Sequence, residues 1–536
     1  MSHIQPHKKN SRWDFIRKLF AHDRLRQLTC FPHLLLFVLL WVFCSWVYDD
    51  VFYMTEQFSF FSFDPVLMEE ITSLTLAPMV WSGRFLLLVF KYPLLGGMLY
   101  AAMLTAIAWL IGRLLPLKGW GSVIGLLLPW LWMAGLLYLG LNIFYRYEPS
   151  YVGSYPLTAL LLLAIVYGVV RLLKKKGSCQ ERGQHIASFL VAVFISVAGF
   201  LGTTAYALTV NANTIATTRM QRLLQKQDWY KMIETAQQLK QPSRPVACYY
   251  AIALEMTDQL IEKMFDIYYQ YPNIKLINRT GGEDVGNFMY EPDADFYCGL
   301  VNPSYHLSME HMVASGKTIY RLKQLFLCAL VNNEIPLANK YMYMLEKVPF
   351  EGDFVKKYKP MIYDRSLVLA DPVLSLVIEM MPLDDSYEET YINPLFLGYY
   401  KQLREGRSPR VYKNCLAAHL YTKELERFLS LLEQNPDNYN AAAFYDALIV
   451  YALKTHNNEF LSSLPLYAIN NVRNMLGEAR AIPGKDSKEK GKKLRDKYLG
   501  LFAFYYFYQN IPDENYASIK DSGLNGNENN NNNKVN

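Results

Sequence analysis

Two adjacent carboxylates, Asp49 and Asp50, directly follow the first apolar run of the chain, which covers residues 31–48. A carboxylate at the end of a membrane helix can accept a proton from a reacting group or help to hold a metal ion. The same two residues can also end an apolar helix in water without any chemical role. Asp49 and Asp50 are therefore candidate catalytic residues, and a solvated helix end is the simpler interpretation.

The placement of Asp49 and Asp50 resembles that of the acidic residue after the first span in integral-membrane glycosyltransferases of the lipid-phosphosugar class. That resemblance implies a membrane enzyme of glycan or lipid-linked substrate transfer. The chain differs from this class because it has five apolar runs, where many more are usual, and no second acidic motif. We therefore treat the enzyme as the alternative function and favour a protein without enzymatic activity.

The remaining reactive residues do not predict a metal or cofactor site. His306 and His311 are five residues apart, whereas ligands on one helix face are three or four apart. No Cys-x-x-Cys pair, nucleotide-binding glycine loop, His-Glu-x-x-His motif or Gly-x-Ser-x-Gly motif occurs. We expect no metal and no cofactor. Four cysteines that follow the apolar runs are expected to be buried thiols, with a disulfide as the alternative: Cys248, Cys298, Cys328 and Cys415.

Five apolar runs dominate the first 210 residues of this 536-residue chain. They cover residues 31–48, 85–112, 121–144, 152–170 and 186–210. The last run has about 25 uncharged residues, which at about 1.5 Å per residue cross a hydrocarbon core of about 30 Å with some tilt. The pattern predicts a basic cytoplasmic segment over residues 1–28 and a transmembrane domain of five helices over residues 29–210.

The basic residues between the apolar runs all give the same orientation in a membrane. Residues 1–28 carry seven Lys and Arg, and Lys174, Lys175 and Lys176 lie just before the last run. Because Lys and Arg stay on the cytoplasmic side, we expect the N-terminus inside and everything after residue 210 outside. Residues 211–536 carry 37 Lys and Arg against 38 Asp and Glu, so this part lacks the basic footprint of a nucleic-acid-binding protein.

Small residues occur four positions apart on two of the apolar runs. They are Gly97 with Ala101, and Gly121 with Gly125. This spacing lets helix backbones approach closely inside a membrane. We expect the four residues to form ordinary packing contacts of a transmembrane bundle.

The chain after residue 210 alternates amphipathic helices with short polar breaks. A helix, a polar turn and a second helix recur at residues 223–239, 325–341 and 448–461, and residues 417–432 supply another second helix. These segments resemble tetratricopeptide-type repeats, in which Trp229 takes the place of the aromatic residue after the turn and Ala338 that of the packing alanine. The resemblance implies an α-solenoid in which Trp229, Ala338 and Tyr341 pack between helices.

The whole chain also resembles a family of uncharacterised bacterial inner-membrane proteins with a polytopic N-terminal half and a tetratricopeptide-like C-terminal half. Residues 300–310 and 320–346 carry this resemblance. It implies an all-α protein of the bacterial inner membrane whose helical-repeat domain, residues 211–515, lies in the periplasm. We expect this domain to be a scaffold that binds an envelope protein or peptide beside the lipid bilayer.

Two further segments of the chain have unusual composition. Residues 485–497 hold seven Lys and Arg, which predicts a solvated loop leading into a helix, with a contact to anionic envelope polymers as the alternative. Residues 516–536 include an Asn-rich stretch and offer no apolar surface, so we expect a disordered tail.

Overall fold

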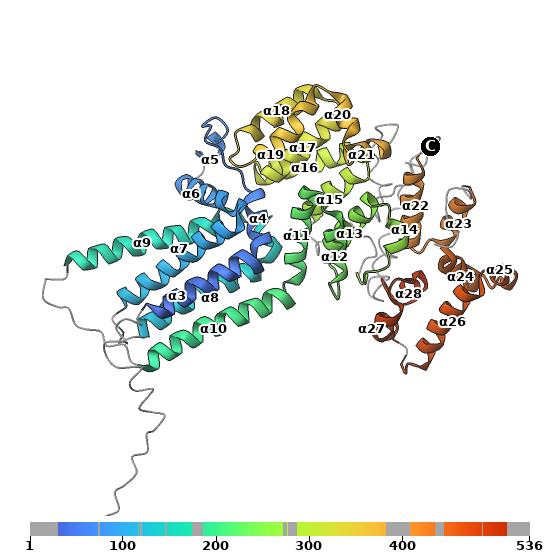
Figure 1. Ribbon diagram of the computed structural model, residues 1–536, viewed down its shortest axis with the longest axis horizontal. Helices are drawn as coiled ribbons and strands as arrows, with labels where there is room; N and C mark the ends of the chain where they lie inside the picture. Colours follow the sequence, from blue (N-terminus) through green and yellow to red (C-terminus); the bar gives the residue numbers. More distant parts are fainter. Residues whose placement is uncertain are drawn as a thin grey trace, which may run out of the picture. The chain divides into compact units, whose positions relative to one another are not determined.

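The computed structural model describes residues 30–72, 76–115, 117, 120–144, 147–173, 186–271, 276, 287–381, 408–434, 444–484 and 486–511. Across these residues the regular structure is entirely helical, without a β-strand (Figure 1). The predicted all-α class is therefore confirmed. The predicted segment 1–28, Lys174, Lys175, Lys176 and the tail 516–536 lie outside the described residues.

The chain divides into two compact units, Met1–Ile215 and Ala216–Asn536, and the division falls within helix α11 (Ala212–Lys226). In the first unit, four helices are long and apolar enough to cross a bilayer. They are α7 (Pro93–Leu114), α8 (Trp120–Leu139) with its extension η3 (Gly140–Phe144), α9 (Tyr151–Leu173) and α10 (Ile186–Thr209). Their length and composition fit a membrane protein.

The first apolar run forms helix α3 (Phe31–Val42) and a π-helical turn, η1 (Phe43–Val47). A bend of 68° separates this pair from the next helix, α4 (Asp49–Gln57). The bent pair is either a fifth, broken span or a re-entrant segment. A single π-helical turn of this kind inserts an extra residue into the helix and is a common cause of a sharp bend.

The second span begins at Pro93 rather than near Phe85, where the apolar run predicts its start. Phe85 belongs to a separate helix, α6 (Ala77–Leu87), which is followed by the short 3₁₀-helix η2 (Leu88–Lys91). Proline has no amide hydrogen to donate and fixes its own φ, so it favours the first turn of a new helix. The connection between the first two apolar runs is also helical, because it contains α4, α5 (Glu69–Thr72) and most of α6.

Helix α7 is the centre of the first unit and packs against α3, α8 and α9, while α10 packs against α3 and α8 (Figure 1). Helix α9 differs from its neighbours because only 6% of its apolar 18-residue stretch is buried. Large apolar side chains such as Leu161, Leu162 and Ile165 are exposed on it. A helix that exposes aliphatic side chains in this way is suited to face lipid.

The second unit is built from short helices (Figure 1). After α11 these are α12 (Trp229–Gln237), α13 (Arg244–Met256), α14 (Leu260–Lys263), α15 (Asn287–Tyr297), α16 (Val301–Ser315), α17 (Ile319–Val331), α18 (Ile335–Glu346), α19 (Gly352–Tyr358), η4 (Lys359–Ile362), α20 (Arg365–Ala370), α21 (Leu374–Met380), α22 (Pro409–Tyr421), α23 (Leu425–Glu433), α24 (Tyr445–Lys454), α25 (Asn458–Ser463), α26 (Leu466–Ala481), α27 (Ser487–Tyr498) and α28 (Phe502–Tyr508).

Within the described part of this unit, one turn recurs six times between consecutive helices. In each turn a single residue has positive φ: Gln227, Asp258, Gly299, Asn333, Lys423 and His456. In each, the next residue donates its amide to the carbonyl five positions earlier, at 2.8–3.0 Å, as Glu334 does to Ala329. This left-handed closure satisfies the last carbonyls of the first helix. The turns join α11 to α12, α13 to α14, α15 to α16, α17 to α18, α22 to α23, and α24 to α25.

Three of the six turns lie where the polar breaks in the sequence predict them, at Gln227, Asn333 and His456. The turns at Asp258 and Gly299 were not predicted. Residues 417–432, expected to form one second helix, contain the end of α22, the turn at Lys423 and most of α23. The interpretation of that segment as a single helix is therefore wrong, because Lys423 adopts the left-handed conformation and ends α22 at Tyr421.

Candidate functional site

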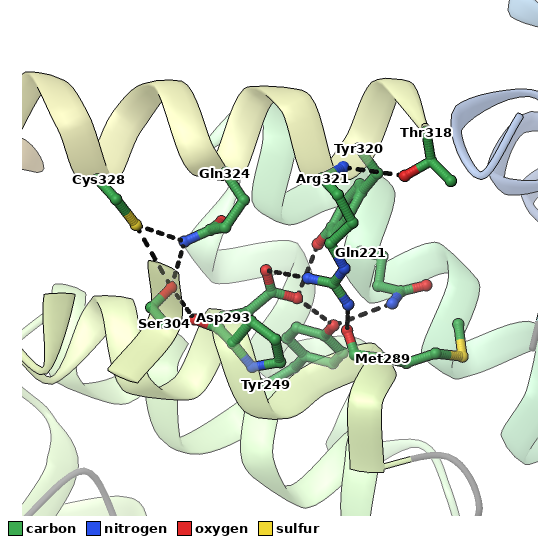
Figure 2. Close-up of polar contacts among 11 residues, drawn as sticks. Gln221, Tyr249, Met289, Asp293, Ser304, Thr318, Tyr320, Arg321, Gln324 and Cys328 are labelled. Atoms are coloured by element: carbon green, nitrogen blue, oxygen red, sulfur yellow. Dashed lines mark hydrogen bonds and ion pairs between the residues drawn. The ribbon is translucent and has the colours of Figure 1, made fainter. Parts of the chain in front are cut away.

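A buried polar cluster of the second unit surrounds the carboxylate of Asp293, on helix α15 (Figure 2). The Asp293 side chain is 1% exposed. Two phenols donate to its Oδ2 atom: Tyr249 of α13 at 2.7 Å and Tyr320 of α17 at 2.8 Å. The Tyr249 oxygen in turn accepts a hydrogen bond from Gln221 of α11 at 3.0 Å. The cluster therefore connects four helices, α11, α13, α15 and α17, each from a different one of four consecutive pairs.

A guanidinium faces the second oxygen of the same carboxylate. Arg321 of α17 is fully buried, and its Nη1 atom lies 4.0 Å from Oδ1 of Asp293. Its Nη2 atom donates to the Met289 carbonyl at 2.9 Å. Thr318 is the N-cap of helix α17, and its Oγ1 accepts a hydrogen bond from the Arg321 amide at 3.2 Å. This N-cap positions the arginine one turn inside the helix, where it points into the cluster (Figure 2).

The protonation of this cluster follows from burial and from the opposing charge. Burial raises the pKa of Asp293, while the Arg321 charge and the two phenol hydrogen bonds act in the opposite direction. Burial, followed by the charge of Asp293, raises the pKa of Tyr249 and of Tyr320 well above the usual range. Both phenols therefore keep their protons and remain hydrogen-bond donors to the carboxylate.

Beside the ionic cluster lies a neutral one, around Ser304 of α16 (Figure 2). Its hydroxyl donates to the Pro292 carbonyl at 2.7 Å and accepts from Nε2 of Gln324 at 2.9 Å. The Cys328 thiol donates to the same hydroxyl at 3.6 Å, and burial raises the pKa of this thiol to about 12. The serine proton is already directed at a carbonyl and the cysteine is held as a thiol, so neither side chain is arranged as a nucleophile.

Together these contacts hold helices in register. Gln221, Tyr249, Asp293, Ser304 and Arg321 are all fully buried or nearly so. A substrate has to reach a catalytic group, whereas a buried network of hydrogen bonds and an ion pair fixes how neighbouring elements pack. The arrangement suits the cluster to joining the pairs α11–α12, α13–α14, α15–α16 and α17–α18.

The two candidate catalytic carboxylates, Asp49 and Asp50, form the first turn of α4. Asp49 is half-buried, and Asp50 is 5% exposed. Carboxylates are favoured at a helix N-terminus because they interact well with its free amides and dipole. The same unit holds a bidentate ion pair between Arg84 of α6 and Glu148, with Nε–Oε1 2.9 Å and Nη2–Oε2 3.1 Å. Neither residue of this pair was singled out from the sequence.

The small residues of the predicted transmembrane packing lie where helix backbones approach closely. A Cβ added at Gly125 of α8 would collide with the Ala108 carbonyl of α7, and one added at Gly97 of α7 would collide with Ser45 in η1. At Gly121 an added Cβ would stand 3.2 Å from the Gly112 carbonyl. Ala101 is fully buried. These contacts join α7 to α8 and α7 to η1.

The three residues expected to pack between repeats are distributed over two helix pairs. Ala338 and Tyr341 of α18 are 1% and 3% exposed, and the Tyr341 hydroxyl is 2.7 Å from that of Tyr305 on α16. Trp229, the first residue of α12, is half-buried with its ring centroid 5.9 Å from that of Tyr297 on α15. The structure therefore brings Tyr341 and Trp229 against α16 and α15 and does not bring them to each other.

The two candidate histidines, His306 and His311, have different surroundings. His306 is exposed and 3.6 Å from Glu310, whereas His311 is buried, and burial together with the Arg321 charge lowers its pKa to about 3. Across the described residues, no three His, Cys, Asp or Glu side chains are grouped to hold a metal ion. Cys248, Cys298, Cys328 and Cys415 are buried.

Asp293 and Arg321, the centre of the cluster, were not predicted. A pointer to them was present: Arg321 and Lys323 interrupt the apolar residues of α17, and Glu291, Asp293 and Asp295 alternate along α15. Charged residues inside an apolar helix are commonly paired when they are buried. The residues of the cluster are spread between Gln221 and Arg321, so the sequence pattern does not show which charged residues contact each other.

Comparison with known proteins gives one match. No curated protein and no solved structure matches the chain at a significant level. The sequence does match a family of unknown function, DUF6057, over residues 25–210 and 144–509. These two stretches together cover most of both units, which agrees with the resemblance to an uncharacterised family. The chain belongs to the DUF6057 family of unknown function.

Proposed function

We propose that this protein is an integral membrane protein whose second unit is a tetratricopeptide-like helical-repeat scaffold that binds a protein or peptide of the bacterial cell envelope. The observation that carries the proposal is the six-fold recurrence of one left-handed turn between consecutive helices. Repeat scaffolds of this class are stacks of antiparallel helix pairs, each of which buries its face on the next.

The spacing of the turns supports a tetratricopeptide-like period. Gly299 and Asn333 are 34 residues apart, and Lys423 and His456 are 33 apart. The typical tetratricopeptide period is 34 residues. Gln227 and Asp258 are 31 apart and Asp258 and Gly299 are 41 apart, so the repeat is degenerate in length while the turn geometry is retained.

The buried network around Asp293 supports a scaffold for a second reason. It occupies the interior between helix pairs, where it fixes their stacking and leaves the outer helix faces for recognition. Exposed aromatic and apolar side chains are present on those faces, including Tyr343, Tyr363 and Leu367. Exposed aromatic residues are favoured anchors in protein interfaces.

We place the second unit in the periplasm and the N-terminus in the cytoplasm of a bacterial inner-membrane protein. The charge distribution supports this orientation, since Lys174, Lys175 and Lys176 precede the last span, α10. A cysteine placed at Lys492 in a Cys30→Ser, Cys179→Ser background should react with a membrane-impermeant maleimide in spheroplasts. One placed at Lys175 should react only after lysis. Equal labelling of both positions in intact spheroplasts would refute the orientation.

The partner is tested by site-specific photo-crosslinking in intact cells. A photo-reactive residue at Tyr343 or Tyr363 should give a discrete crosslinked species, identified by mass spectrometry, that disappears when Ala338→Leu disturbs the packing of α18. A probe at lipid-facing Ile165 is the matched control and should crosslink to lipid alone. Absence of any crosslinked protein at exposed positions of all six helix pairs would contradict the scaffold.

The second candidate function is a membrane enzyme of glycan or lipid-linked substrate transfer. The 68° bend before α4 favours it, because the bend puts Asp49 and Asp50 at a helix N-terminus directly after an apolar helix. Broken helices in membrane proteins often accompany functional sites. Replacing both carboxylates separates this candidate from the scaffold.

A further inference from the structure

Helix α27 (Ser487–Tyr498) concentrates positive charge in a unit that is otherwise close to neutral. Within twelve residues it carries six basic residues against two acids, Glu489 and Asp496. The basic residues are Lys488, Lys490, Lys492, Lys493, Arg495 and Lys497. Over residues 211–536 as a whole, 37 basic residues face 38 acidic ones. The positive charge of α27 is therefore a local feature.

The helix is firmly docked by its opposite side. Gly491, Leu494 and Tyr498 are buried, and a Cβ added at Gly491 would stand 2.9 Å from the Tyr508 carbonyl of α28. Arg495 places its guanidinium 5.1 Å from the centre of the Tyr268 ring. The N-terminus is closed by Asp486, which accepts the Lys488 amide at 2.8 Å. These contacts fix α27 on the unit, so its exposed lysines lie on a packed helix. The sequence predicts a solvated loop leading into a helix over residues 485–497.

The outward side of α27 carries Lys492, Lys493 and Lys497 as exposed residues. Neighbouring α26 adds Arg473 and Arg480, both exposed. The acids facing this surface are Glu478, which is paired with Lys497, together with Asp486, Glu489 and Asp496. In all, α26, α27 and the cap residue contain eight basic residues and four acids. We call the surface that carries the exposed Lys492 and Lys493 and the half-buried Lys490 the basic face.

We infer that the basic face binds the anionic phospholipid headgroups of the bilayer in which the first unit is anchored. Charge complementarity carries the inference, since clusters of four to eight Lys or Arg on a helix suit an anionic lipid surface. The second unit begins at Ala216, only a few residues after span α10 ends at Thr209. This tether keeps the bilayer at a high effective concentration, so weak electrostatic attraction suffices for contact. The inference holds on either side of the membrane and does not depend on the proposed scaffold function.

The contact is measured on the full chain in lipid nanodiscs. A fluorophore is attached to Ala481→Cys, at the exposed end of α26, in a Cys30→Ser, Cys179→Ser background; the other described cysteines are buried. Quenching by headgroup nitroxide lipid is compared in phosphatidylcholine discs and in discs with about one-third phosphatidylglycerol. Each lysine near an anionic surface strengthens the contact about fivefold, so Lys490→Gln, Lys492→Gln, Lys493→Gln should weaken it about 100-fold.

The expected result is strong quenching in anionic discs at low salt, little in neutral discs, and loss at about 1 M salt, where the Debye length is about 3 Å. The control triple variant Lys340→Gln, Lys347→Gln, Lys356→Gln removes the same charge from exposed positions on other helices and should quench like the wild type. Equal quenching in both lipids, or equal effects of the two triple variants, would overturn the inference. A third outcome would also overturn the inference. If the lipid does not quench the fluorophore but soluble polyphosphate shields it from a soluble quencher, the basic face binds an anionic polymer instead.

Discussion

Gly299, in the turn between α15 and α16, contacts the backbone of Met380 at the end of α21. Its φ is +84°, and a Cβ added to it would stand 2.5 Å from the Met380 carbonyl carbon. Two independent requirements therefore select glycine at this position: the left-handed conformation and the close approach of another chain segment. The contact links a repeat turn to the end of a helix, Met380, which is 81 residues further along the chain.

Gly299→Ala should lower the stability of the second unit by about 2–5 kcal/mol, from left-handed strain of about 1–2 kcal/mol and a clash of about 1–3 kcal/mol. The matched control is Gly484→Ala, since Gly484 has φ +104° with nothing within 4 Å of an added Cβ. That control should lose only the strain component. Melting temperatures of the detergent-solubilised proteins measure both, and equal losses would show that the contact with Met380 is unimportant.

The sequence predicts those parts of the fold that neighbouring residues determine, and it does not predict those that depend on contacts between distant residues. The turns at Asn333 and His456 have polar residues around them and were predicted, whereas Cys298-Gly299-Leu300 sits between apolar residues and was missed. The apolar residues Phe85–Phe90 predict a second span that begins near Phe85, although Pro93 interrupts this run, and the helix begins at Pro93 as the backbone rule for proline favours. The Asp293 cluster joins residues from 221 to 321, and hydrophobic periodicity carries no information about such pairings.

In the first unit, Gly125→Ala should destabilise the packing of α7 against α8 by about 1–3 kcal/mol, because the new methyl group meets the rigid Ala108 carbonyl. Gly135→Ala lies on the same helix α8 with nothing within 4 Å of the added Cβ. It should be neutral or slightly stabilising, since alanine favours a helix over glycine. Thermal aggregation in detergent compares the two, and a larger loss for Gly135→Ala would refute the packing assignment.

The ion pair of the buried cluster is tested by a double-mutant cycle. Arg321→Met leaves the Asp293 carboxylate without its cation and should cost about 3–5 kcal/mol of unfolding free energy. Asp293→Asn combined with Arg321→Met removes both charges and should recover at least about 1 kcal/mol of that loss, because the two residues are coupled. Strictly additive losses in denaturant unfolding would show that the guanidinium and carboxylate act independently.

Stability should also depend on pH through Glu255 of α13, which is buried and accepts a hydrogen bond from Nη1 of Arg410 at 2.9 Å. Burial raises the pKa of Glu255 to about 7, although the Arg410 charge opposes the shift. An acid with a raised folded pKa contributes stability that is complete below its unfolded pKa and is lost as the pH rises through the folded value.

The unfolding free energy should therefore fall by up to about 3 kcal/mol between about pH 4.5 and pH 7 on account of this residue. Glu255→Gln cannot ionise and should flatten that part of the profile. Denaturant titrations of both proteins at several pH values provide the measurement. A wild-type profile that rises over this interval by an amount that Glu255→Gln abolishes would give the opposite sign and contradict the assignment.

The scaffold and the enzyme make opposite predictions for two variants tested for rescue of a gene-deletion strain at matched protein levels. Ala338→Leu forces extra volume into a 1% exposed site on α18, at a cost of about 1–3 kcal/mol. Asp49→Asn with Asp50→Asn removes both carboxylates at the start of α4 with little change in shape. The scaffold account predicts full rescue by the double asparagine variant and failure of Ala338→Leu. Rescue by Ala338→Leu together with failure of the asparagine variant would contradict it, since loss of an acid–base carboxylate costs an enzyme about 100-fold or more in rate.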